Sequence, residues 1–313
     1  MSLKILIILS LVTNLFGLNF QSDSIDGQLR ETVEGQVTET KFTNILPEIS
    51  KIPTRLNSND PVIYANNLIL IDSQSNQVLY QEKGQESVPI ASTTKIMTAM
   101  IAIENYDLNQ IATISKKAAN QNGSGTNLIY GEEISIINLL KCLLIRSGND
   151  SAYAVAEIYN GEVEDFVDLM NKKAEFLKMK KTFYSDPAGL NPETKSSARD
   201  LSIITKYALE NEVFSEIVKT GETSVTDISG IRHHDLKNSN RLVNDYNYPG
   251  AIGVKTGYLP EAGHCLVAAA ERGGVRLIAV ILNTGYDTPE ASAIEAKKLL
   301  DWGFSSFKYN REL

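Results

Sequence analysis

Three short motifs carry the side chains best suited to nucleophilic chemistry. The first is Ser92-Thr93-Thr94-Lys95, in which a hydroxyl precedes an amine by three residues. On a helix these two positions share a face, so the two groups can meet. A hydroxyl becomes a useful nucleophile when a neighbouring base takes its proton. A lysine can be that base only if burial or a helix N-terminus lowers its pKa. Taken alone, the same spacing is also typical of a helix cap with a solvated lysine.

The second motif, Ser147-Gly148-Asn149, directly follows an apolar run with helical spacing. Glycine and asparagine are what helix-ending turns need, so a plain turn is one interpretation. The functional interpretation gives Ser147 a proton-relay role and uses the Asn149 amide to hold a substrate backbone.

The third motif, Lys255-Thr256-Gly257, ends an apolar run typical of a strand. It could be a solvated strand end entering a turn, but a cation and a hydroxyl can also hold a substrate carboxylate. Gly257 would let a substrate backbone approach closely. Strand alternation places Lys255 and Thr256 on opposite faces, so both can serve one site only if the substrate lies along an edge strand. The motif therefore predicts an edge strand.

Strands at the two ends of the chain would position the third motif. Residues 62–80 form a predicted β-hairpin around a polar turn, because apolar residues alternate on either side of it. Three apolar runs come much later, at 252–256, 265–270 and 277–282, with Arg272-Gly273-Gly274 as a tight turn between the last two.

The middle of the chain has helical periodicity. A helix is predicted from Ser92, with others over 135–144, 152–159 and 163–178, and a closing helix over 289–303. In the fourth of these, Phe166, Met170 and Phe176 are predicted to face inward, and Ser197 with Asp200 resembles a helix-capping pair. Terminal strands with a helical middle predict an α+β fold, an antiparallel sheet flanked by helices with a helical subdomain.

The N-terminal part differs from the rest of the chain. Residues 1–20 contain Lys4 and an apolar run over 5–16, which indicates a signal peptide or an N-terminal anchor. Residues 21–60 are polar and acidic with several Gly and Pro, as in a flexible linker. The catalytic domain is therefore predicted over residues 61–313.

Composition and charge limit the partners and cofactors that the protein is expected to bind. A net charge of −8 and a pI near 5.1 argue against a nucleic-acid partner. Cys142 and Cys265 lie in apolar runs and are predicted to be buried free thiols, although pairing stays open. The three histidines, at 233, 234 and 264, lack companion ligands, so neither a metal nor another cofactor is expected.

In combination, the three motifs match the order of the S-x-x-K, S-x-N and K-T-G set of penicillin-binding enzymes. The chain resembles the low-molecular-weight penicillin-binding proteins, specifically the serine-type D-Ala-D-Ala carboxypeptidases of the peptidase S11 kind. The resemblance covers about residues 62–307 and implies a β-lactamase/transpeptidase-like fold. Besides the motifs it includes Asp186-Pro187-Ala188-Gly189-Leu190, Ser197-Ala198-Arg199-Asp200 and Asp301-Trp302-Gly303-Phe304.

The resemblance implies a catalytic role for three residues. Ser92 would attack the carbonyl between the two terminal D-alanines of a peptidoglycan stem peptide and become acylated. Lys95 would take its proton, and Ser147 would pass a proton to the leaving D-alanine. Water would then release the shortened peptide, and β-lactam antibiotics would act as covalent inhibitors.

Substrate binding is implied for five more positions. Asn149 would bind the substrate amide, and Lys255 and Thr256 the terminal carboxylate. Gly257 completes the motif. The backbone N–H groups of Ser92 and Tyr258 would together form the oxyanion hole.

Other activities of the same fold are alternatives. A β-lactamase needs a carboxylate-activated water, and no Glu-x-x-x-Asn element occurs between Ser147 and Lys255. A DD-endopeptidase would use the same residues on peptidoglycan cross-links. An inactive cell-wall-binding protein is the third alternative, and the intact motifs argue against it.

The resemblance also implies action outside the cytoplasmic membrane, whether secreted, periplasmic or attached to the cell wall. Many relatives carry a C-terminal β-domain that ends in a membrane helix, whereas nothing after Phe304 in this sequence resembles an anchor. Contact with the membrane is therefore expected only through an uncleaved N-terminus.

Overall fold

The computed structural model describes residues 32–33, 36–37, 52–286 and 288–310. The predicted signal peptide or anchor at 1–20, and most of the predicted linker, lie outside the described residues. Within the linker, β1 (Thr32–Val33) and β2 (Gln36–Val37) form a short antiparallel pair. Contacts divide the chain into residues 1–49 and 50–313, and the second unit contains all three motifs.

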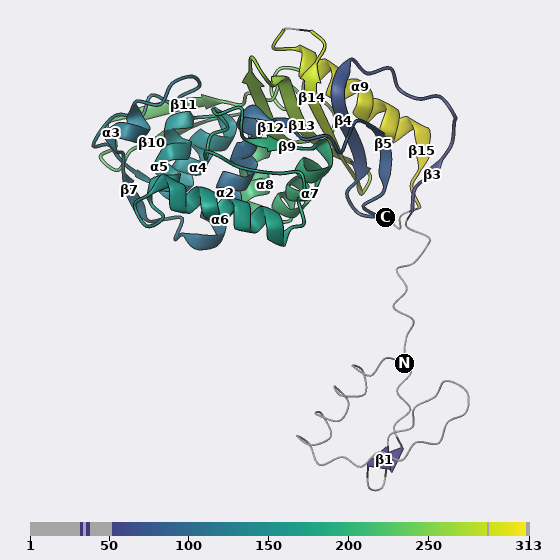
Figure 1. Ribbon diagram of the computed structural model, residues 1–313, viewed down its shortest axis with the longest axis horizontal. Helices are drawn as coiled ribbons and strands as arrows, with labels where there is room; N and C mark the ends of the chain where they lie inside the picture. The colour runs from purple at the N-terminus through teal and green to yellow at the C-terminus, as the bar shows by residue number, and fades with distance from the viewer. Residues whose placement is uncertain (1–31, 34–35, 38–51, 287, 311–313) are drawn as a thin grey trace. The chain divides into compact units, whose positions relative to one another are not determined.

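A five-stranded antiparallel sheet joins the two ends of this unit (Figure 1). Its strands lie in the order β12-β13-β14-β4-β5, so the C-terminal strands pair with the N-terminal hairpin through β14 and β4. Both predicted hairpins and the predicted antiparallel α+β class are confirmed. The strands are β4 (Ala65–Asp72), β5 (Val78–Glu82), β12 (Ala251–Leu259), β13 (Gly263–Arg272) and β14 (Val275–Thr284).

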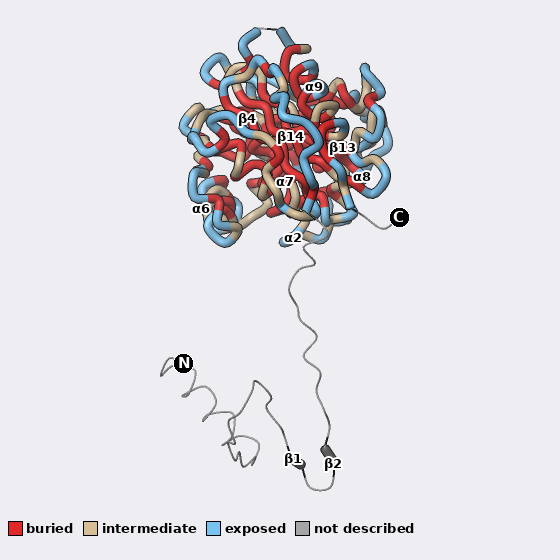
Figure 2. The backbone as a smooth tube through the Cα atoms, turned by 90° about the vertical axis from the view of Figure 1, so that its right-hand side faces the viewer, coloured by how far each residue is buried: buried red, intermediate tan, exposed pale blue. Residues whose placement is uncertain are grey.

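The sheet is buried on both faces, which explains why its strands are nearly continuous apolar runs. The closing helix α9 (Ala291–Ser306) packs on one face, where Leu70, Leu277 and Leu300 share a core cluster. The other face contacts α7 and α8 and belongs to the larger core of the helical region. Figure 2 shows the buried backbone concentrated along β4, β14 and α9.

The helical region lies between β5 and β12 in sequence and, in space, on the side of the sheet opposite α9 (Figure 1). Its helices are η2 (Ala91–Thr94), α2 (Lys95–Asn105), α3 (Lys116–Ala119), α4 (Ile136–Ile145), α5 (Asn149–Glu157), α6 (Val163–Phe176), α7 (Ala198–Leu209) and α8 (Glu212–Lys219). Three short antiparallel pairs accompany them: β6 (Val88–Pro89) with β9 (Lys195–Ser196), β7 (Ile111–Thr113) with β8 (Glu133–Ser135), and β10 (Glu222–Thr226) with β11 (His233–Lys237).

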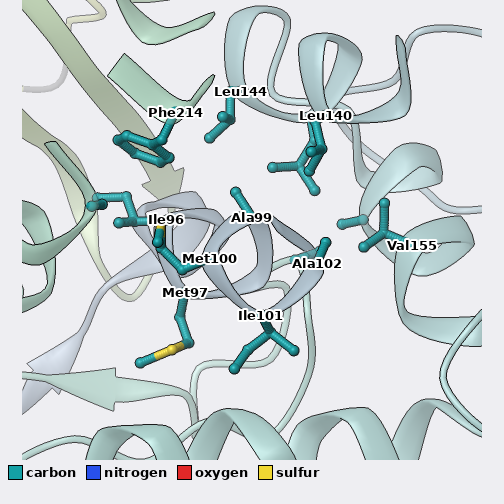
Figure 3. Packing of buried hydrophobic residues seen from close by; sticks show 14 of the residues in the cluster. Ile96, Met97, Ala99, Met100, Ile101, Ala102, Leu140, Leu144, Val155 and Phe214 are labelled. Atoms are coloured by element: carbon teal, nitrogen blue, oxygen red, sulfur yellow. The ribbon is translucent and has the colours of Figure 1, made fainter. Parts of the chain in front are cut away.

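Helix α2 is the centre of this region and is buried from Lys95 to Ala102. Figure 3 shows Leu140 and Leu144 of α4, Val155 of α5 and Phe214 of α8 packed around it. A helix that is apolar on all sides must be surrounded by protein. Such packing leaves few alternative positions for a side chain at its N-terminus, and the first motif begins there.

The predicted inward position of Phe176 is wrong, because its side chain is 73 % exposed. The buried stripe of α6 runs through Phe166, Met170 and Ala174, at the four-residue spacing of one helix face. Phe176 comes two residues after Ala174 and is turned by about 200° from that stripe, since each residue turns a helix by about 100°.

The packed part of the chain extends N-terminal to the predicted domain start at residue 61. Strand β3 (Thr54–Arg55) pairs with β15 (Phe307–Lys308), which comes directly after the closing helix. The indole N–H of Trp302 donates to the carbonyl of Asn59 at 2.9 Å, and the Arg55 guanidinium lies 5.3 Å from the centre of the Trp302 ring. Neither contact could be predicted from neighbouring residues in the sequence, because the partners are more than 240 residues apart.

Both cysteines are buried and free, as predicted. Among the described residues, no helix is long and apolar enough to cross a membrane.

Candidate active site

Ser92 lies in a single 3-10 turn, η2, immediately before helix α2. The predicted helix therefore begins in the tighter form and becomes α-helical at Lys95. A 3-10 turn has three residues, so positions i and i+3 eclipse each other and Ser92 lies over Lys95. The preceding residue, Ala91, has a φ of +47°, which is a strained conformation for a residue with a side chain.

Lys95 is fully buried, and its amine contacts three oxygen atoms. Nζ lies 2.8 Å from Ser92 Oγ, 2.7 Å from Asn149 Oδ1 and 2.8 Å from the Ala188 carbonyl oxygen. An ammonium can donate to all three. A neutral amine can donate to the two carbonyl-type oxygens and accept from the Ser92 hydroxyl. A proton can therefore move from Ser92 to Lys95 without any rearrangement of these contacts.

Burial lowers the pKa of Lys95 from 10.5 to about 7, although the carboxylates of Asp186 and Asp150 oppose this shift. Desolvation penalises the charged form of an amine, so the neutral form is populated near neutral pH. A neutral amine beside a hydroxyl is the arrangement that a general base requires.

The loop at 186–190 supplies one of the three contacts to Lys95. One carboxylate oxygen of Asp186 accepts from the backbone N–H groups of Ala188, Gly189 and Leu190 at 2.6–3.1 Å, which folds the loop tightly. This conformation directs the Ala188 carbonyl to Lys95. Gly189 has a φ of +74°, and a Cβ there would lie 2.0 Å from the Ala91 carbonyl oxygen. The loop and the turn at Ala91–Thr94 that contains Ser92 (the nucleophile turn) therefore contact each other closely at a position that only glycine fits.

The second motif forms the junction between α4 and α5. Ser147 is buried with a φ of +67°, so this residue breaks the helix and allows the chain to turn. Asn149 begins α5 with its amide held on both sides, because Oδ1 faces Lys95 and Nδ2 donates to the Asn122 carbonyl at 2.6 Å. The structure thus connects the first two motifs directly.

The third motif lies on β12, which is an edge strand of the sheet, as predicted, and pairs only with β13 among the described strands. Lys255 is fully buried, and its pKa is lowered well below 10.5, first by burial and then by the nearby charge of Lys95. Its Nζ donates to the Thr256 carbonyl at 3.1 Å, and the Thr256 hydroxyl donates to Ser239 Oγ at 2.7 Å.

Gly257 brings β12 against the nucleophile turn. A Cβ at this position would lie 3.0 Å from the backbone nitrogen of Ser92 and 3.0 Å from the carbonyl oxygen of Ile90. The close approach that this glycine permits is therefore to the turn itself. Tyr258 comes next, half exposed, with its ring stacked on His264 at 4.4 Å. The backbone of Ser92 and the edge of β12 thus lie side by side.

Four contributors to this site were not identified as such from the sequence. The carboxylates of Asp186 and Asp150 act through the backbone, since Asp150 accepts from the N–H groups of Thr126 and Leu128. The Ala188 contact is made by a main-chain atom, and Ser239 has no motif of its own. The family segments around residues 150 and 186 were the available signals, and they did not show these contacts. Among the described residues, no cluster of three or more His, Cys, Asp or Glu could hold a metal ion.

The fold and the geometry of the site together define the class of enzyme to which this protein is similar. A half-buried serine paired with a buried lysine at the start of a central helix, beside an edge strand with Lys-Thr-Gly, is the arrangement of active-site-serine acyl-transfer enzymes of the penicillin-binding kind. The structure is similar to the crystal structure of the Streptomyces K15 DD-transpeptidase, with a TM-score of 0.74 and 32 % identity over 79 % of this chain and 100 % of that chain.

Sequence relatives agree with this class. The family model for D-alanyl-D-alanine carboxypeptidase, peptidase S11, matches residues 54–285. The chain therefore belongs to that family. It is 38 % identical to the D-alanyl-D-alanine carboxypeptidase DacF of Bacillus subtilis over 78 % of this chain, and it spans 63 % of the length of DacF. It is also 32 % identical to a D-alanyl-D-alanine endopeptidase of Pseudomonas aeruginosa, over 75 % of this chain and 76 % of that relative.

Proposed function

We propose that this protein is a serine-type D-Ala-D-Ala carboxypeptidase that removes the terminal D-alanine from peptidoglycan stem pentapeptides. The observation that carries the proposal is the 2.8 Å contact between Ser92 Oγ and a buried Lys95 amine whose pKa is lowered to about 7. Family membership supports the same activity.

In the proposed acylation step, Ser92 Oγ attacks the carbonyl carbon between the two D-alanines while its proton moves to Lys95. The developing negative charge falls on the carbonyl oxygen. The backbone N–H groups of Ser92 and Tyr258 would hold this oxygen, and one such donor typically contributes about 3 kcal/mol. The C–N bond then breaks, and the proton held by Lys95 passes through Ser147 to the departing amine, which leaves Lys95 neutral. Lys95 then takes a proton from water as that water attacks the acyl carbon. The ester bond to Ser92 Oγ breaks, Oγ regains its proton from Lys95, and the shortened peptide is released.

The substrate would lie along β12, whose outer edge pairs with no other described strand and can take up an extended peptide. In this pose the Thr256 hydroxyl and the Lys255 ammonium bind the terminal carboxylate, and Asn149 binds the peptide amide. A bound carboxylate favours the charged form of Lys255 and offsets the cost of its burial. The Thr256–Ser239 contact would hold the hydroxyl in place.

The alternative of a DD-endopeptidase uses the same residues on a cross-linked substrate. The similarity to an endopeptidase of Pseudomonas aeruginosa favours keeping it as a second candidate. Both activities proceed through the same acyl-enzyme and differ only in the leaving group. The proposed place of action is outside the cytoplasmic membrane, where peptidoglycan lies, and β-lactams are the proposed covalent inhibitors.

Product analysis on a defined stem pentapeptide tests the proposal. The expected products are one D-alanine and one tetrapeptide per turnover, with both lost in Ser92→Ala. A second arm with a cross-linked peptide dimer measures the endopeptidase activity. Failure of the wild-type protein to release D-alanine from the pentapeptide, with the dimer cleaved, would favour the second candidate.

A further inference from the structure

The side-chain amide of Asn149 is oriented by two partners and retains one N–H group for a ligand. Its oxygen lies 2.7 Å from Lys95 Nζ, and its nitrogen donates to the Asn122 carbonyl at 2.6 Å. A primary amide has two N–H donors, and within the described residues the second one has no acceptor. The reversed amide would place its oxygen against the Asn122 carbonyl, and two acceptors form no hydrogen bond. The Asn122 carbonyl therefore determines which end of the amide faces Lys95.

The loop at 122–126 supplies this carbonyl and holds Asn149 at a second point. The Ser124 carbonyl accepts from the backbone N–H of Asn149 at 2.7 Å, so both the main chain and the side chain of this residue are bound to the loop. Gly123 lies between the two contacts with a φ of +84°, and a Cβ there would lie 3.0 Å from Asn149 Nδ2. A side chain at Gly123 would therefore press on the amide nitrogen.

The C-terminal end of the loop is held at Thr126. Its backbone N–H donates to Asp150 at 2.8 Å, and its carbonyl oxygen lies 2.9 Å from His234 Nδ1. A carbonyl oxygen can only accept, so Nδ1 must carry the hydrogen in this contact. His234, which lies on β11, is thus connected to Asn149 through the loop and not through the catalytic motifs directly.

His234 is itself held by a second contact. Its Nε2 lies 2.6 Å from Oε1 of Glu132, whose side chain is completely buried. The other carboxylate oxygen of Glu132 accepts from the backbone N–H of Ile129 at 3.1 Å. An imidazole that is bonded through both nitrogens has a fixed ring orientation. His234 can therefore hold the Thr126 carbonyl in one place.

We propose that the loop at 122–126 positions Asn149 for the substrate and that His234 is the positioning residue that holds this loop through Thr126. The loop keeps the second N–H of Asn149 in place for the carbonyl of an acylated amino group. It therefore determines the preference for acylated substrates over those with a free amine at this position. This inference rests on the proposed function, because Asn149 is the residue proposed there to bind the substrate amide.

Two β-lactams with the same reactive nucleus separate this role from general stability. Benzylpenicillin carries an acyl group on its 6-amino nitrogen, whereas 6-aminopenicillanic acid has the free amine and offers no such carbonyl. The readout is the ratio of their acylation rate constants, benzylpenicillin over 6-aminopenicillanic acid, measured by intact-mass spectrometry. A loss of folded protein lowers both rate constants and leaves the ratio unchanged, whereas a displaced Asn149 amide lowers the ratio.

Gly123→Ala should lower this ratio by at least about fivefold, because the added methyl group displaces the Asn149 amide. Gly131→Ala is the matched control, since Gly131 has nearly the same φ, +82°, but a Cβ there would meet nothing within 4 Å. Both substitutions carry the same backbone cost, so the ratio in Gly131→Ala should stay within about twofold of wild type. A wild-type ratio in folded Gly123→Ala, or an equal fall in Gly131→Ala, would overturn the proposal.

His234→Ala should lower the ratio by at least about threefold, because it releases the Thr126 carbonyl. His234→Asn should recover most of this loss, since asparagine carries an N–H the same number of bonds from the backbone as Nδ1. The control His233→Ala removes the neighbouring exposed imidazole, whose Nδ1 lies 3.3 Å from Thr226 Oγ1, and should keep the wild-type ratio. A wild-type ratio in His234→Ala, or an equally low ratio in His234→Asn, would overturn the role of His234.

Circular dichroism checks that each variant folds. The glycine and histidine substitutions act at opposite ends of the loop, so either set decides if a variant of the other does not fold. Acylation of the wild-type protein by benzylpenicillin reports on the proposed function separately. If the wild-type protein is acylated and the ratios do not change in the variants, only the positioning role is wrong.

Discussion

At the scale of single residues, the proposed chemistry depends on two buried lysines, Lys95 and Lys255. Each would be costly as an unpaired buried cation, and burial lowers the pKa of both. Their proposed functions differ because their partners differ. Lys95 faces a hydroxyl and two carbonyl-type oxygens, which suits a base, whereas Lys255 lies on the strand where a substrate carboxylate would bind and restore its charge.

Acylation should therefore depend on pH through Lys95. The neutral amine is the active form, so the rate should rise as pH increases through about 7 and level off above it. The rate of acylation by a chromogenic β-lactam, measured across the pH range on both sides of this value, checks this. A rate that is flat across the range, or that falls with rising pH, would contradict it.

Lys95→Met should lower the acylation rate by at least about a hundredfold, because it removes the base beside Ser92. The exposed Lys116→Met is the control and should keep the wild-type rate and pH profile. Circular dichroism checks that both variants fold. Substantial acylation by a folded Lys95→Met protein would mean that another group takes the proton of Ser92.

At the scale of elements, the site depends on three segments that meet at Ser92. Helix α2 is fixed by the core around it, β12 approaches through Gly257, and the loop at 186–190 approaches through Gly189. The nucleophile turn between them has Ala91 in a strained conformation, with its carbonyl oxygen held by the Thr94 hydroxyl at 2.7 Å. Strain of this kind persists only where surrounding structure over-determines it.

Gly189→Ala should disrupt this interlock. The added Cβ would lie 2.0 Å from the Ala91 carbonyl oxygen, so either the turn or the loop must move, and Lys95 would lose its contact with Ala188. We expect destabilisation of about 3 kcal/mol or more and a strong loss of acylation rate. Denaturant unfolding and the β-lactam reaction measure the two effects.

Gly161→Ala is the matched control, because Gly161 also has a positive φ, at +84°, but a Cβ there would meet nothing within 4 Å. Gly161→Ala should lower the free energy of unfolding by only about 1–2 kcal/mol, which is the cost of a positive φ for a residue with a side chain. It should leave the acylation rate unchanged. Equal effects of the two substitutions would show that the interlock does not hold the turn.

Sequence patterns predicted the elements that have many periodic residues and missed what depends on distant contacts. The sheet strands and most helices around α2 were predicted because burial on a face leaves a readable period, whereas the short helix α8 (Glu212–Lys219) was not predicted. The positive φ of Ala91 and of Ser147 gives no such signal, since neither residue is a glycine. The Ser92–Lys95 contact was predictable from spacing, whereas the Ser239 contact and the Ala188 carbonyl depend on how distant segments pack.

At the scale of the whole molecule, two strand pairs join the two ends of the domain. Strand β14 pairs with β4 within the five-stranded sheet, and β15 pairs with β3 in a separate two-stranded sheet. The β3–β15 pair lies beside α9, on the side of the sheet opposite the helical region that contains Ser92. It should therefore contribute to stability without taking part in the chemistry.

Two truncated proteins separate these contributions. A protein that begins at residue 52 should be soluble and fully active. One that begins at residue 62 loses β3 and the Asn59 contact to Trp302, so we expect a loss of about 1–3 kcal/mol, or a Tm lower by several degrees. Its acylation rate should equal that of the longer protein. Identical Tm values would contradict the proposed role of β3, and a lost acylation rate would connect this edge to the site.

Ser92 is the proposed acylating nucleophile, and intact-mass spectrometry after exposure to penicillin is a direct test of this role. A β-lactam imitates the D-Ala-D-Ala bond, so the wild-type protein should gain the mass of one penicillin, and peptide mapping should place it on Ser92. Ser92→Ala should gain no penicillin mass. Ser147→Ala retains Ser92, so any adduct that this variant forms should map to Ser92. A covalent adduct on Ser92→Ala, or an adduct of the wild-type protein mapped to another residue, would show that Ser92 is not the nucleophile.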